Sequence, residues 1–484
     1  MTVTTLSNCL CTFIRYNKRW SFQALAFLIA TTSLFFYNLH FHLKSNRCIT
    51  YALARSCGSI LKWCLMPSII LPISRVIFTL ARNSRVGKYL GLDRRLADHQ
   101  LFAYGASFFA IVHMLAHLLY KPSSFKGQSG ITGLIMLLSL ALPLSGVFLM
   151  RRYFRVMEKY SYSTQILRPH QLGAALFIAA YSLHTPDGRL LYFSISMYGT
   201  YLLDRILEHF FFTYYTKIRK ATKITNTQYI LLSIDRPSGF RKTLPGQYAL
   251  FSFPEIDAKL ECFHPFTIFS DDGNTLIFLI RRAGRWTCTF SDLINEEQNG
   301  RGLKIVLIGP YGSTLNIFYD LPSLTLIGSG IGLTMPFSFL NHNFNNNHQM
   351  PKLEIHISQR TVNEFIPCIT TLNNINDKNT ARVTIHFYLT SALPSSDCYK
   401  LFNALNGIGT SNKKIMEFHF DNHIINTRFR SKDSLIIYVH LGRPDLEKIV
   451  RSANVVGICG NPMLMKEVYS LSLNHGKKCY QECF

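Results

Sequence analysis

The chain has 484 residues, of which 48% are hydrophobic and only 16% are charged, and its formal net charge at pH 7 is +24. This length indicates two or three domains, and the apolar composition excludes a protein that is an ordinary soluble enzyme throughout. A nucleic-acid-binding protein is also disfavoured, because no RNA- or DNA-binding motif accompanies the positive charge. Apolar runs are concentrated in the first 215 residues, whereas the remainder has a globular composition.

Six apolar segments in this first part are long enough to cross a bilayer, which needs about 20 largely apolar residues per helix. They lie near residues 22–39, 59–80, 101–120, 131–150, 171–183 with its flanks, and 190–214. The first is not a cleavable signal, because a polar lead precedes it and no small-residue cleavage pattern follows. Pro67, Pro72 and Arg75 weaken the second. We expect a cytosolic lead over residues 1–21 and a multi-pass α-helical domain over residues 22–216, embedded in the lipid bilayer.

Basic residues indicate how these spans are oriented, because they are enriched in cytoplasmic loops. One cluster lies between the second and third spans and another between the fourth and fifth, namely Arg82, Arg85, Lys88, Arg94 and Arg95, then Arg151, Arg152, Arg155, Lys159 and Arg168. The opposite loops carry only Lys121, Lys126 and Arg189. The N-terminus and everything after residue 214 are therefore expected in the cytosol, and this arrangement accounts for much of the net charge.

Two of the apolar segments carry histidine pairs with the same spacing. Thirteen residues separate His99 from His113, and thirteen separate His170 from His184. Fourteen helical steps advance about 21 Å and return to within roughly 40° of the same face. Two neighbouring helices of this kind offer one pair of facing imidazoles near each membrane surface, which suits two b-type haems. Histidines that only pack helices are the alternative. Pairing His99 with His117 would align even better, but His113 matches the level of His184.

The second half begins with short segments of alternating apolar residues, rich in Gly and Pro. LPGQYALFSFP, HPFTIFS and LIFLIRRAGRWTCTF predict antiparallel strands and a small β-barrel over residues 222–318. The runs LTLI, KLEIHIS, RVTIHFYL, SLIIYVHL and NVVGICG predict a parallel sheet with crossover helices over residues 319–484. Between them, NHNFNNNHQ is expected to be a surface loop. The twelve cysteines form no CxxC pair, so neither a zinc site nor a disulfide framework is indicated.

A glycine-rich stretch, LPSLTLIGSGIGLTMPF, joins a buried strand to a helical pattern in this second half. Gly328, Gly330 and Gly332 follow the strand, and glycines there let backbone amides approach a pyrophosphate at the helix N-terminus. Taken alone, this pattern is only weakly specific for a nucleotide site.

Together these features resemble the ferric reductase and NADPH oxidase superfamily of transmembrane flavocytochromes, and most closely its short fungal metalloreductase-like branch. The resemblance rests on the two histidine pairs and on HPFT, IRRAGRWT, GPYGS, GSGIGLTMP and CGNPMLMKEV in this order, and it covers roughly residues 55–484. It implies a cytosolic ferredoxin-reductase-like module, in which an antiparallel FAD barrel precedes an α/β domain that binds NADPH. Ile308, Arg285 and Met335 depart from the family pattern, which leaves the detailed nucleotide geometry and the turnover rate open.

The resemblance also implies roles for individual residues. Phe266 would pack on the flavin ring and Thr267 would hydrogen-bond it. The rest of the cofactor site would comprise His264 and Pro265 in the flavin pocket, Arg281 on the FAD pyrophosphate, Gly284, Trp286 and Thr287 lining it, and Gly309, Pro310, Gly312, Gly328, Gly330 and Gly332 on the nucleotide side.

The nicotinamide end of the site is assigned in the same way. Cys459, Gly460 and Pro462 would lie beside the nicotinamide. Arg360 would pair with a 2′-phosphate and favour NADPH, unless it is a solvated surface residue. Phe484 would cover the flavin until the nicotinamide displaces it. Thr267, Cys459 and Phe484 are the expected catalytic residues.

The layout implied by the family is an electron path from NADPH to FAD, then to the inner haem (His99, His170), the outer haem (His113, His184) and an acceptor across the membrane. We expect an NADPH-dependent metalloreductase that reduces Fe(III) or Cu(II) in iron or copper homeostasis. The alternative is an NADPH oxidase that makes superoxide from oxygen, for which Arg55 and His117 would stand near the outer haem. A scaffold without turnover is a third interpretation. The plasma membrane and the endoplasmic reticulum are both open, and no protein partner is identified.

Overall fold

The computed structural model describes residues 18–83, 95–153, 168–253, 263–296, 300–312, 315–346, 351–373, 383–391, 415–421, 424–430 and 436–481. The chain divides into two compact units, a helical unit over Lys18–Phe211 and a second unit that includes Phe212–Phe484.

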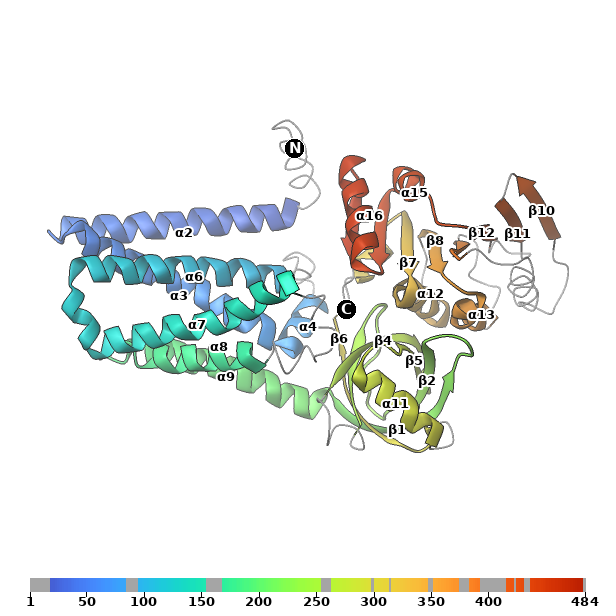
Figure 1. The fold of residues 1–484 in the computed structure, drawn as a ribbon, viewed down its shortest axis with the longest axis horizontal. Helices are drawn as coiled ribbons and strands as arrows, with labels where there is room; N and C mark the ends of the chain where they lie inside the picture. The colour runs from blue at the N-terminus through green and yellow to red at the C-terminus, as the bar shows by residue number, and fades with distance from the viewer. Residues whose placement is uncertain are drawn as a thin grey trace. The chain divides into compact units, whose positions relative to one another are not determined.

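Long helices make up the helical unit (Figure 1). They are α2 (Lys18–Lys44), α3 (Ile49–Ile73), α4 (Arg75–Asn83), α6 (Arg95–Tyr120), α7 (Gln128–Tyr153), α8 (Arg168–Ser182) and α9 (Arg189–Phe211). Helix α3 packs against α2 and α6, and α7 packs against α8. The connections α2–α3, α6–α7 and α8–α9 all lie at one end of this unit (Figure 1). Residues near the end of α6 and the end of α8 therefore share one end of the unit.

Helices occupy the six segments that were predicted to span a membrane, but they differ in length and apolarity. Among the described residues, Asp98–Tyr120 is the one helix long and apolar enough to cross a membrane by itself. Ile49–Pro72 and Arg75–Ala81 pass the same test only as a pair, with a bend of 90° at the break. Gln128–Ala141 is apolar but shorter. The multi-pass arrangement therefore stays a prediction.

Residues 59–80, predicted as the second span, are divided in the structure, because α3 ends at Ile73 and α4 begins at Arg75. The fully buried Asp204 of α9 accepts hydrogen bonds from the backbone N–H groups of Arg75 and Ile77, at 3.0 and 2.9 Å. A carboxylate in this place satisfies amides of the first turn of a helix, which have no partner within the helix itself. Asp204 therefore helps α4 to start as a separate helix.

The predicted β-barrel is confirmed. Six antiparallel strands close it in the order β1-β2-β5-β4-β3-β6, namely β1 (Thr213–Lys223), β2 (Tyr229–Asp235), β3 (Tyr248–Ser252), β4 (His264–Asp271), β5 (Thr275–Arg281) and β6 (Lys304–Tyr311). Alternate residues point into the barrel, as Ile230, Leu232 and Ile234 of β2 do. Helix α11 (Arg285–Glu296) adds Phe290 and Ile294 to the same core.

The predicted parallel sheet is also confirmed. Its parallel strands are β7 (Ser323–Ser329), β8 (Lys352–Gln359), β9 (Val383–Leu389), β12 (Ile436–Leu441), β13 (Val455–Cys459) and β14 (Lys478–Gln481). The sequence analysis did not predict the hairpin of β10 (Ile415–Asp421) and β11 (Ile424–Arg430), which extends the sheet to the order β10-β11-β12-β9-β8-β7-β13-β14.

Helices cover both faces of this sheet, as the βαβ pattern requires. Side chains from α12 (Thr334–Asn346) and α13 (Ile366–Asn373), such as Phe337 and Ile369, pack with Ile355 and Ile385 on one face. On the other face, α15 (Leu446–Ser452) and α16 (Pro462–Asn474) pack over β7 and β13.

The prediction that NHNFNNNHQ is a surface loop is wrong for its first part, which belongs to α12. Asn341, His342 and Asn343 are at least 92% buried, with exposed fractions of 8%, 8% and 1%. The Asn341 side-chain amide donates to the carbonyl of Phe269 at 2.8 Å, and His342 Nε2 lies 2.9 Å from the carbonyl oxygen of Thr243. The Asn343 amide donates to the carbonyl of Phe339 in the same helix, at 2.7 Å. Carbonyl groups thus permit these polar side chains to be buried, which their polar composition did not indicate.

Candidate functional site

Two pairs of imidazoles face each other in the helical unit: His99 and His113 come from α6, His170 comes from α8, and His184 follows two residues after the end of α8 at Ser182. The ring centres of His99 and His170 are 6.0 Å apart, and those of His113 and His184 are 6.3 Å apart. Two imidazoles that ligate one first-row metal ion have ring centres roughly 6 Å apart, because each metal–nitrogen bond is about 2 Å long. Each pair therefore has the separation that one bis-histidine metal centre requires.

Hydrogen bonds at Nδ1 orient these rings. His99 Nδ1 lies 2.5 Å from the carbonyl oxygen of Ser68, and His113 Nδ1 lies 2.7 Å from that of Ala54. His184 Nδ1 lies 3.1 Å from the hydroxyl of Thr132. A carbonyl can only accept, so Nδ1 of His99 and His113 carries the proton and donates it, and Nε2 keeps a lone pair. Metal-ligating histidines are commonly fixed in this way.

Two glycines leave room for the rings at the end of the unit that holds His113 and His184. A Cβ on Gly58 of α3 would lie 3.1 Å from Cε1 of His113, and one on Gly133 of α7 would lie 3.3 Å from Cε1 of His184. Both distances are tighter than ordinary van der Waals contact. A side chain at either position would push against the imidazole.

His117 lies beside this outer pair but opposite neither of its members. Its ring centre is 4.7 Å from that of His113, in an edge-to-face arrangement. His113, His117 and His184 line a cavity of about 120 Å³ together with Met114 and Phe177. The alternative of pairing His99 with His117 is not the arrangement seen, because His99 faces His170.

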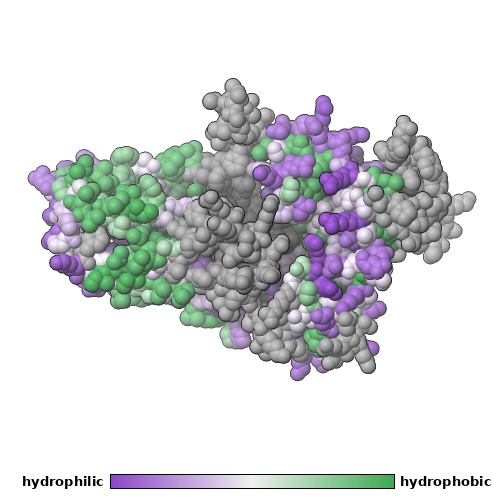
Figure 2. Space-filling model, viewed as in Figure 1, coloured by the Kyte–Doolittle hydropathy of each residue, from purple (hydrophilic) through white to green (hydrophobic). Residues whose placement is uncertain are grey.

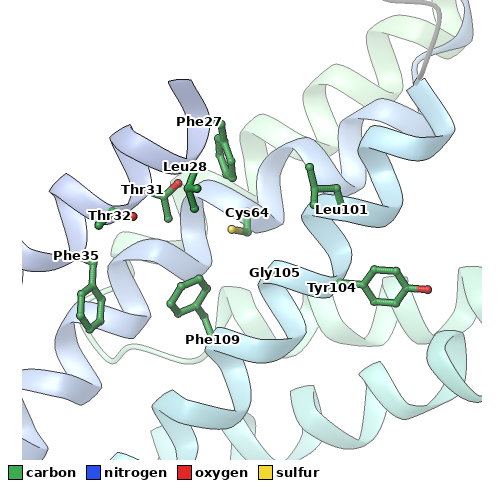
Figure 3. A pocket seen from close by; sticks show the side chains of 10 residues that line it. All are labelled: Phe27, Leu28, Thr31, Thr32, Phe35, Cys64, Leu101, Tyr104, Gly105 and Phe109. Carbon is green, nitrogen blue, oxygen red and sulfur yellow. The ribbon is translucent and has the colours of Figure 1, made fainter. Parts of the chain in front are cut away.

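A larger hollow of about 580 Å³ lies elsewhere in the helical unit, between α2, α3 and α6 (Figure 3). Apart from Thr31, Thr32 and the hydroxyl of Tyr104, its lining is apolar, with Phe27, Phe35 and Phe109 prominent in Figure 3. Its lining, as far as the described residues form it, includes no histidine, so this hollow is separate from the imidazole pairs.

In the second unit, the antiparallel pairing of β4 and β5 brings the HPFT segment beside the IRRAGRWT segment, because β4 begins where β5 ends. The ring centre of Trp286 lies 4.4 Å from the ring centre of His264 and 5.7 Å from that of Phe266. Trp286 and Thr267 are buried, whereas Pro265 and Arg281 are exposed. These residues form a partly open aromatic wall with a cation at its edge.

The loop between β5 and α11 is shaped by Thr287. Its hydroxyl oxygen accepts hydrogen bonds from the backbone N–H groups of Ala283 and Gly284, both at 3.0 Å. The same hydroxyl donates a hydrogen bond to the carbonyl of Gly284 at 2.9 Å. Arg281 stands immediately before this loop at the end of β5. The structure thus brings Arg281, Gly284, Trp286 and Thr287 together.

The last strand of the barrel carries the next predicted residues. Gly309 and Pro310 lie in β6, and Gly312 follows it with a φ of +71°, in the left-handed region that favours glycine. A Cβ on Gly312 would lie 2.9 Å from Cε1 of Tyr248, and one on Gly309 would lie 3.1 Å from the carbonyl oxygen of Tyr248. Both glycines therefore permit the close approach of β3.

The glycine loop after β7 meets the end of β13 in direct backbone contact. A Cβ on Gly332 would lie 2.2 Å from the carbonyl oxygen of Cys459 and 2.8 Å from the nitrogen of Gly460. Cys459 is 3% exposed, and Pro462 begins α16 after the N-cap Asn461. Gly332, Cys459 and Gly460 are thus brought together at the carboxyl end of the parallel strands, where open α/β sheets bind ligands.

Two residues that the sequence analysis missed, Tyr229 and Gln359, connect the barrel to the glycine loop. The Tyr229 hydroxyl donates to Oε1 of Gln359 at 3.3 Å, and Nε2 of Gln359 donates to the carbonyl of Gly330 at 2.9 Å. Burial raises the pKa of the Tyr229 phenol, so the hydroxyl stays protonated. Tyr229 also pairs with Arg281 across β2 and β5. In the sequence, only the position of Gln359 at the end of a predicted strand could have pointed to this contact.

Arg360 follows Gln359 directly and is exposed at the end of β8. Its backbone N–H donates to the Glu364 carboxylate at 2.8 Å, and its carbonyl accepts from the Ser391 hydroxyl. The backbone is therefore held while the guanidinium remains open to solvent. Phe484 lies outside the described residues.

Of the three positions that depart from the family pattern, two are buried. Ile308 of β6 pairs with Thr213 and Leu250 and is 6% exposed, and Met335 is 1% exposed in the core of the α/β domain. Arg285 begins α11.

Comparisons with known proteins identify two domain families in the second unit. A family model described as "FAD-binding domain" matches residues 215–315, and one described as "Ferric reductase NAD binding domain" matches residues 322–473. A superoxide-generating NADPH oxidase heavy chain of Dictyostelium discoideum is 26% identical over 398 residues, which cover 69% of this chain and 56% of that protein. The putative respiratory burst oxidase homolog protein G of Arabidopsis thaliana is 24% identical over 505 residues, which cover 85% and 57%.

The chain thus spans about half the length of these two curated relatives. Among solved structures, the flavohemoglobin of Malassezia yamatoensis aligns with a TM-score of 0.40 at 16% identity, over 90% of this chain and 98% of that chain.

Proposed function

This chain belongs to the ferric reductase and NADPH oxidase superfamily, and from this premise we propose that it carries electrons from cytosolic NADPH across a membrane. The two facing imidazole pairs, in the same chain as FAD-binding and NAD-binding domains, are the observation that carries the proposal. FAD would bind to the barrel, and one b-type haem would bind between the members of each pair.

Exposed apolar side chains support the membrane location of the helical unit. Figure 2 shows a large hydrophobic area over it, in contrast to the mostly hydrophilic second unit. Soluble monomers rarely expose such areas. The exposed large residues include Leu28 of α2, Leu119 of α6, Leu138 of α7, Leu172 of α8 and Leu202 of α9. We place this unit in the plasma membrane or the endoplasmic reticulum, with the basic loops and the second unit in the cytosol.

The four imidazoles would act as iron ligands, with one pair at each end of the bundle. His99 and His113 are fourteen residues apart on α6, so their Cα atoms are separated by about 21 Å along the helix axis. The Nδ1 contacts of His99, His113 and His184 with Ser68, Ala54 and Thr132 would fix these three rings and leave Nε2 for the iron. Bound haem would supply one-electron transfer, with its potential set by these ligands and their surroundings.

In the second unit, the chain's residues would position flavin and nicotinamide. Phe266, Trp286 and His264 would form the wall of the flavin pocket, and Arg281 would pair with a pyrophosphate oxygen. The Gly332–Cys459 contact would hold the glycine loop beside the strand end that receives the nicotinamide. FAD held by these residues would supply the conversion between hydride transfer and single-electron transfer.

We propose Fe(III) or Cu(II) as the acceptor, reduced for metal uptake. Because His113 and His184 would both be used to hold the outer haem, the acceptor would receive its electron without binding to the iron, as a chelated metal ion can. Oxygen is the second candidate, with superoxide as its product. It is favoured by His117 in the cavity beside His113 and His184, by the proximity of Arg55 to His113 and His117, and by the oxidase names of the relatives.

The haem proposal is tested by reduced-minus-oxidised spectra of the purified full chain. We expect a b-type spectrum with about two haems per chain. His113→Ala or His184→Ala should remove the outer haem, and His99→Ala or His170→Ala the inner one. His117→Ala is the matched control on α6 and should keep both. Spectra that are unchanged in all four ligand variants would overturn the assignment.

The acceptor is tested in membranes that contain the full chain, with NADPH-driven ferric reduction and superoxide formation recorded separately. Ferric reduction that persists without oxygen and resists superoxide dismutase supports the metalloreductase. Reduction abolished by the dismutase assigns the protein as an oxidase, and His117→Ala should then lower superoxide formation without loss of haem.

A further inference from the structure

Three neighbouring strands at the centre of the parallel sheet carry polar and aromatic side chains on one face. Strands buried on both faces normally present aliphatic residues to the covering helices, as this sheet does on the side of α12 and α13. The opposite face of β8, β9 and β12 instead carries Glu354, His356, His386, Tyr388, Tyr438 and His440. Strand register places His356 directly beside His386, and their rings stack 4.5 Å apart.

We propose that Glu354, His356 and His386 form a binding site for a divalent transition-metal ion, with Zn²⁺ as the ion that best fits the ligands. Nε2 of His356 lies 3.1 Å from Oε1 of Glu354, and Nε2 of His386 lies 3.4 Å from the same oxygen. All candidate ligand atoms lie within 4.8 Å of one another. A tetrahedral ion with ligand bonds of about 2.0 Å has ligand atoms roughly 3.3 Å apart, so the two distances from Nε2 of the histidines to Oε1 of Glu354 match its edges.

Each imidazole of the proposed site has a partner at its other nitrogen. His356 Nδ1 lies 3.1 Å from the Tyr388 hydroxyl, and His386 Nδ1 lies 3.0 Å from Nε2 of His440. Both partners can accept a hydrogen bond from a protonated Nδ1, which leaves the Nε2 lone pairs for the ion. Such outer hydrogen bonds fix the tautomer and the ring orientation of metal-ligating histidines.

Burial and charge fit a site with three protein ligands and one open position. The His356 side chain is 2% exposed and that of His386 16%, whereas that of Glu354 is 39% exposed. Glu354 would supply the negative charge of the site, and its carboxylate is the most exposed of the three ligand groups. Water can therefore reach the fourth position past Glu354, as in zinc sites that keep an open coordination position. The choice of Zn²⁺ follows from two imidazoles and a carboxylate without sulfur ligands.

The proposal is independent of the electron path, since none of these residues belongs to the flavin, nucleotide or haem sites. A bound ion would link β8 to β9 a short distance before Gln359 and Arg360. The alternative is a hydrogen-bonded aromatic cluster that only stabilises the sheet.

The test uses the purified full chain in detergent, treated with a chelator and titrated with Co²⁺ and then Zn²⁺. We expect visible absorption bands of four-coordinate Co²⁺ at one equivalent, abolished by Zn²⁺. Glu354→Gln keeps the size of an accessible side chain and should weaken Zn²⁺ binding at least tenfold. Tyr388→Phe removes only the hydrogen bond to Nδ1 of His356 and should weaken Zn²⁺ binding about tenfold. His475→Ala, a histidine that pairs with Glu447 away from the cluster, should change nothing.

His386→Ala removes a second ligand of the proposed site and should also weaken Zn²⁺ binding. The proposal requires this result in both Glu354→Gln and His386→Ala. Zn²⁺ that binds to the imidazole pairs of the helical unit would persist in Glu354→Gln, so the difference from the wild type isolates this site. Unchanged stoichiometry and affinity in both Glu354→Gln and His386→Ala would overturn the proposal. The absence of four-coordinate Co²⁺ bands in the wild type would do the same, and flavin and haem content, measured in parallel, report on the proposed function separately.

Discussion

The contact between Gly332 and the end of β13 makes Gly332→Ala a sharp test of the nucleotide site. The new Cβ would lie 2.2 Å from the carbonyl oxygen of Cys459 and 2.5 Å from its carbonyl carbon. Ordinary contact begins at 3.4 Å, so the oxygen and the methyl group must separate by 3.4 − 2.2 = 1.2 Å. Because both neighbours are backbone atoms, no rotamer change can relieve the clash, and the glycine loop or the strand end must move.

A displacement of this size has two measurable consequences. Overpacking of a buried site costs about 1–3 kcal/mol of the free energy of unfolding. Misplacement of a binding group by about 1 Å can cost up to a hundredfold in rate. We therefore expect the KM for NADPH to rise at least tenfold, which corresponds to about 1.4 kcal/mol. The assay is NADPH-driven reduction of an artificial acceptor by the full chain in detergent, with FAD content and thermal unfolding measured in parallel.

Gly457→Ala is the matched control in β13. Its Cβ would lie 2.6 Å from Cδ2 of Leu326 and 3.3 Å from the Phe318 ring, which are side-chain atoms that can move. It should lower the unfolding temperature but leave the KM for NADPH within about twofold of the wild type, because the cost falls on core packing. An unchanged KM in Gly332→Ala, or an equal rise in Gly457→Ala, would show that this backbone contact does not position the nucleotide.

Four further predictions concern other parts of the chain. Tyr229→Phe leaves Oε1 of Gln359 without its hydroxyl donor and should cost about 1–3 kcal/mol of unfolding free energy at unchanged FAD content, measured by thermal unfolding and flavin absorbance. Arg360→Ala should raise the KM for NADPH and not that for NADH, since a guanidinium pairs with a 2′-phosphate; equal changes would make it a surface residue. A hydrogen bond with Thr50 lowers the pKa of the exposed Cys48 thiol. Cys48 should therefore react with an impermeant maleimide on intact cells (or sealed vesicles of matching orientation), and Cys48→Ser should abolish this labelling. Labelling that appears only after permeabilisation would contradict the predicted orientation, in which the loop between α2 and α3 faces away from the cytosol. Gly58→Ala should lower outer-haem occupancy, whereas Gly199→Ala, with nothing within 4 Å of its Cβ, should not; equal haem spectra would count against the crowding argument.

Much of the second unit could be predicted from the sequence because its signals are local. The runs KLEIHIS and RVTIHFYL are apolar enough to predict buried parallel strands, and both form them. The bend between α3 and α4 was not predictable in this way, because the carboxylate that caps α4 comes from Asp204, 129 residues after Arg75. The Tyr229–Gln359 hydrogen bond joins residues 130 apart and left no pattern.

The candidate sites show the same limit. The equal spacing of the two histidine pairs identified which imidazoles share a level, and these do face each other, although His184 lies just beyond the end of α8. By contrast, Glu354 and His356 are two residues apart in a strand, so the sequence indicated only that they share a face. His386 joins them through strand register, which the sequence did not reveal.

The orientation of three imidazoles, those of His99, His113 and His184, depends on helices that carry none of them. Ser68 and Ala54, whose carbonyls hold Nδ1 of His99 and His113, belong to α3, and Thr132, which holds Nδ1 of His184, belongs to α7. The two glycines that admit the outer rings lie on the same two helices. Because α6 is packed along α3, and α8 along α7, a shift of either supporting helix would turn the rings without changing a single ligand. The spacing of the histidines therefore determines where an iron can be held, whereas the packing of α3 and α7 determines whether the Nε2 lone pairs point at it.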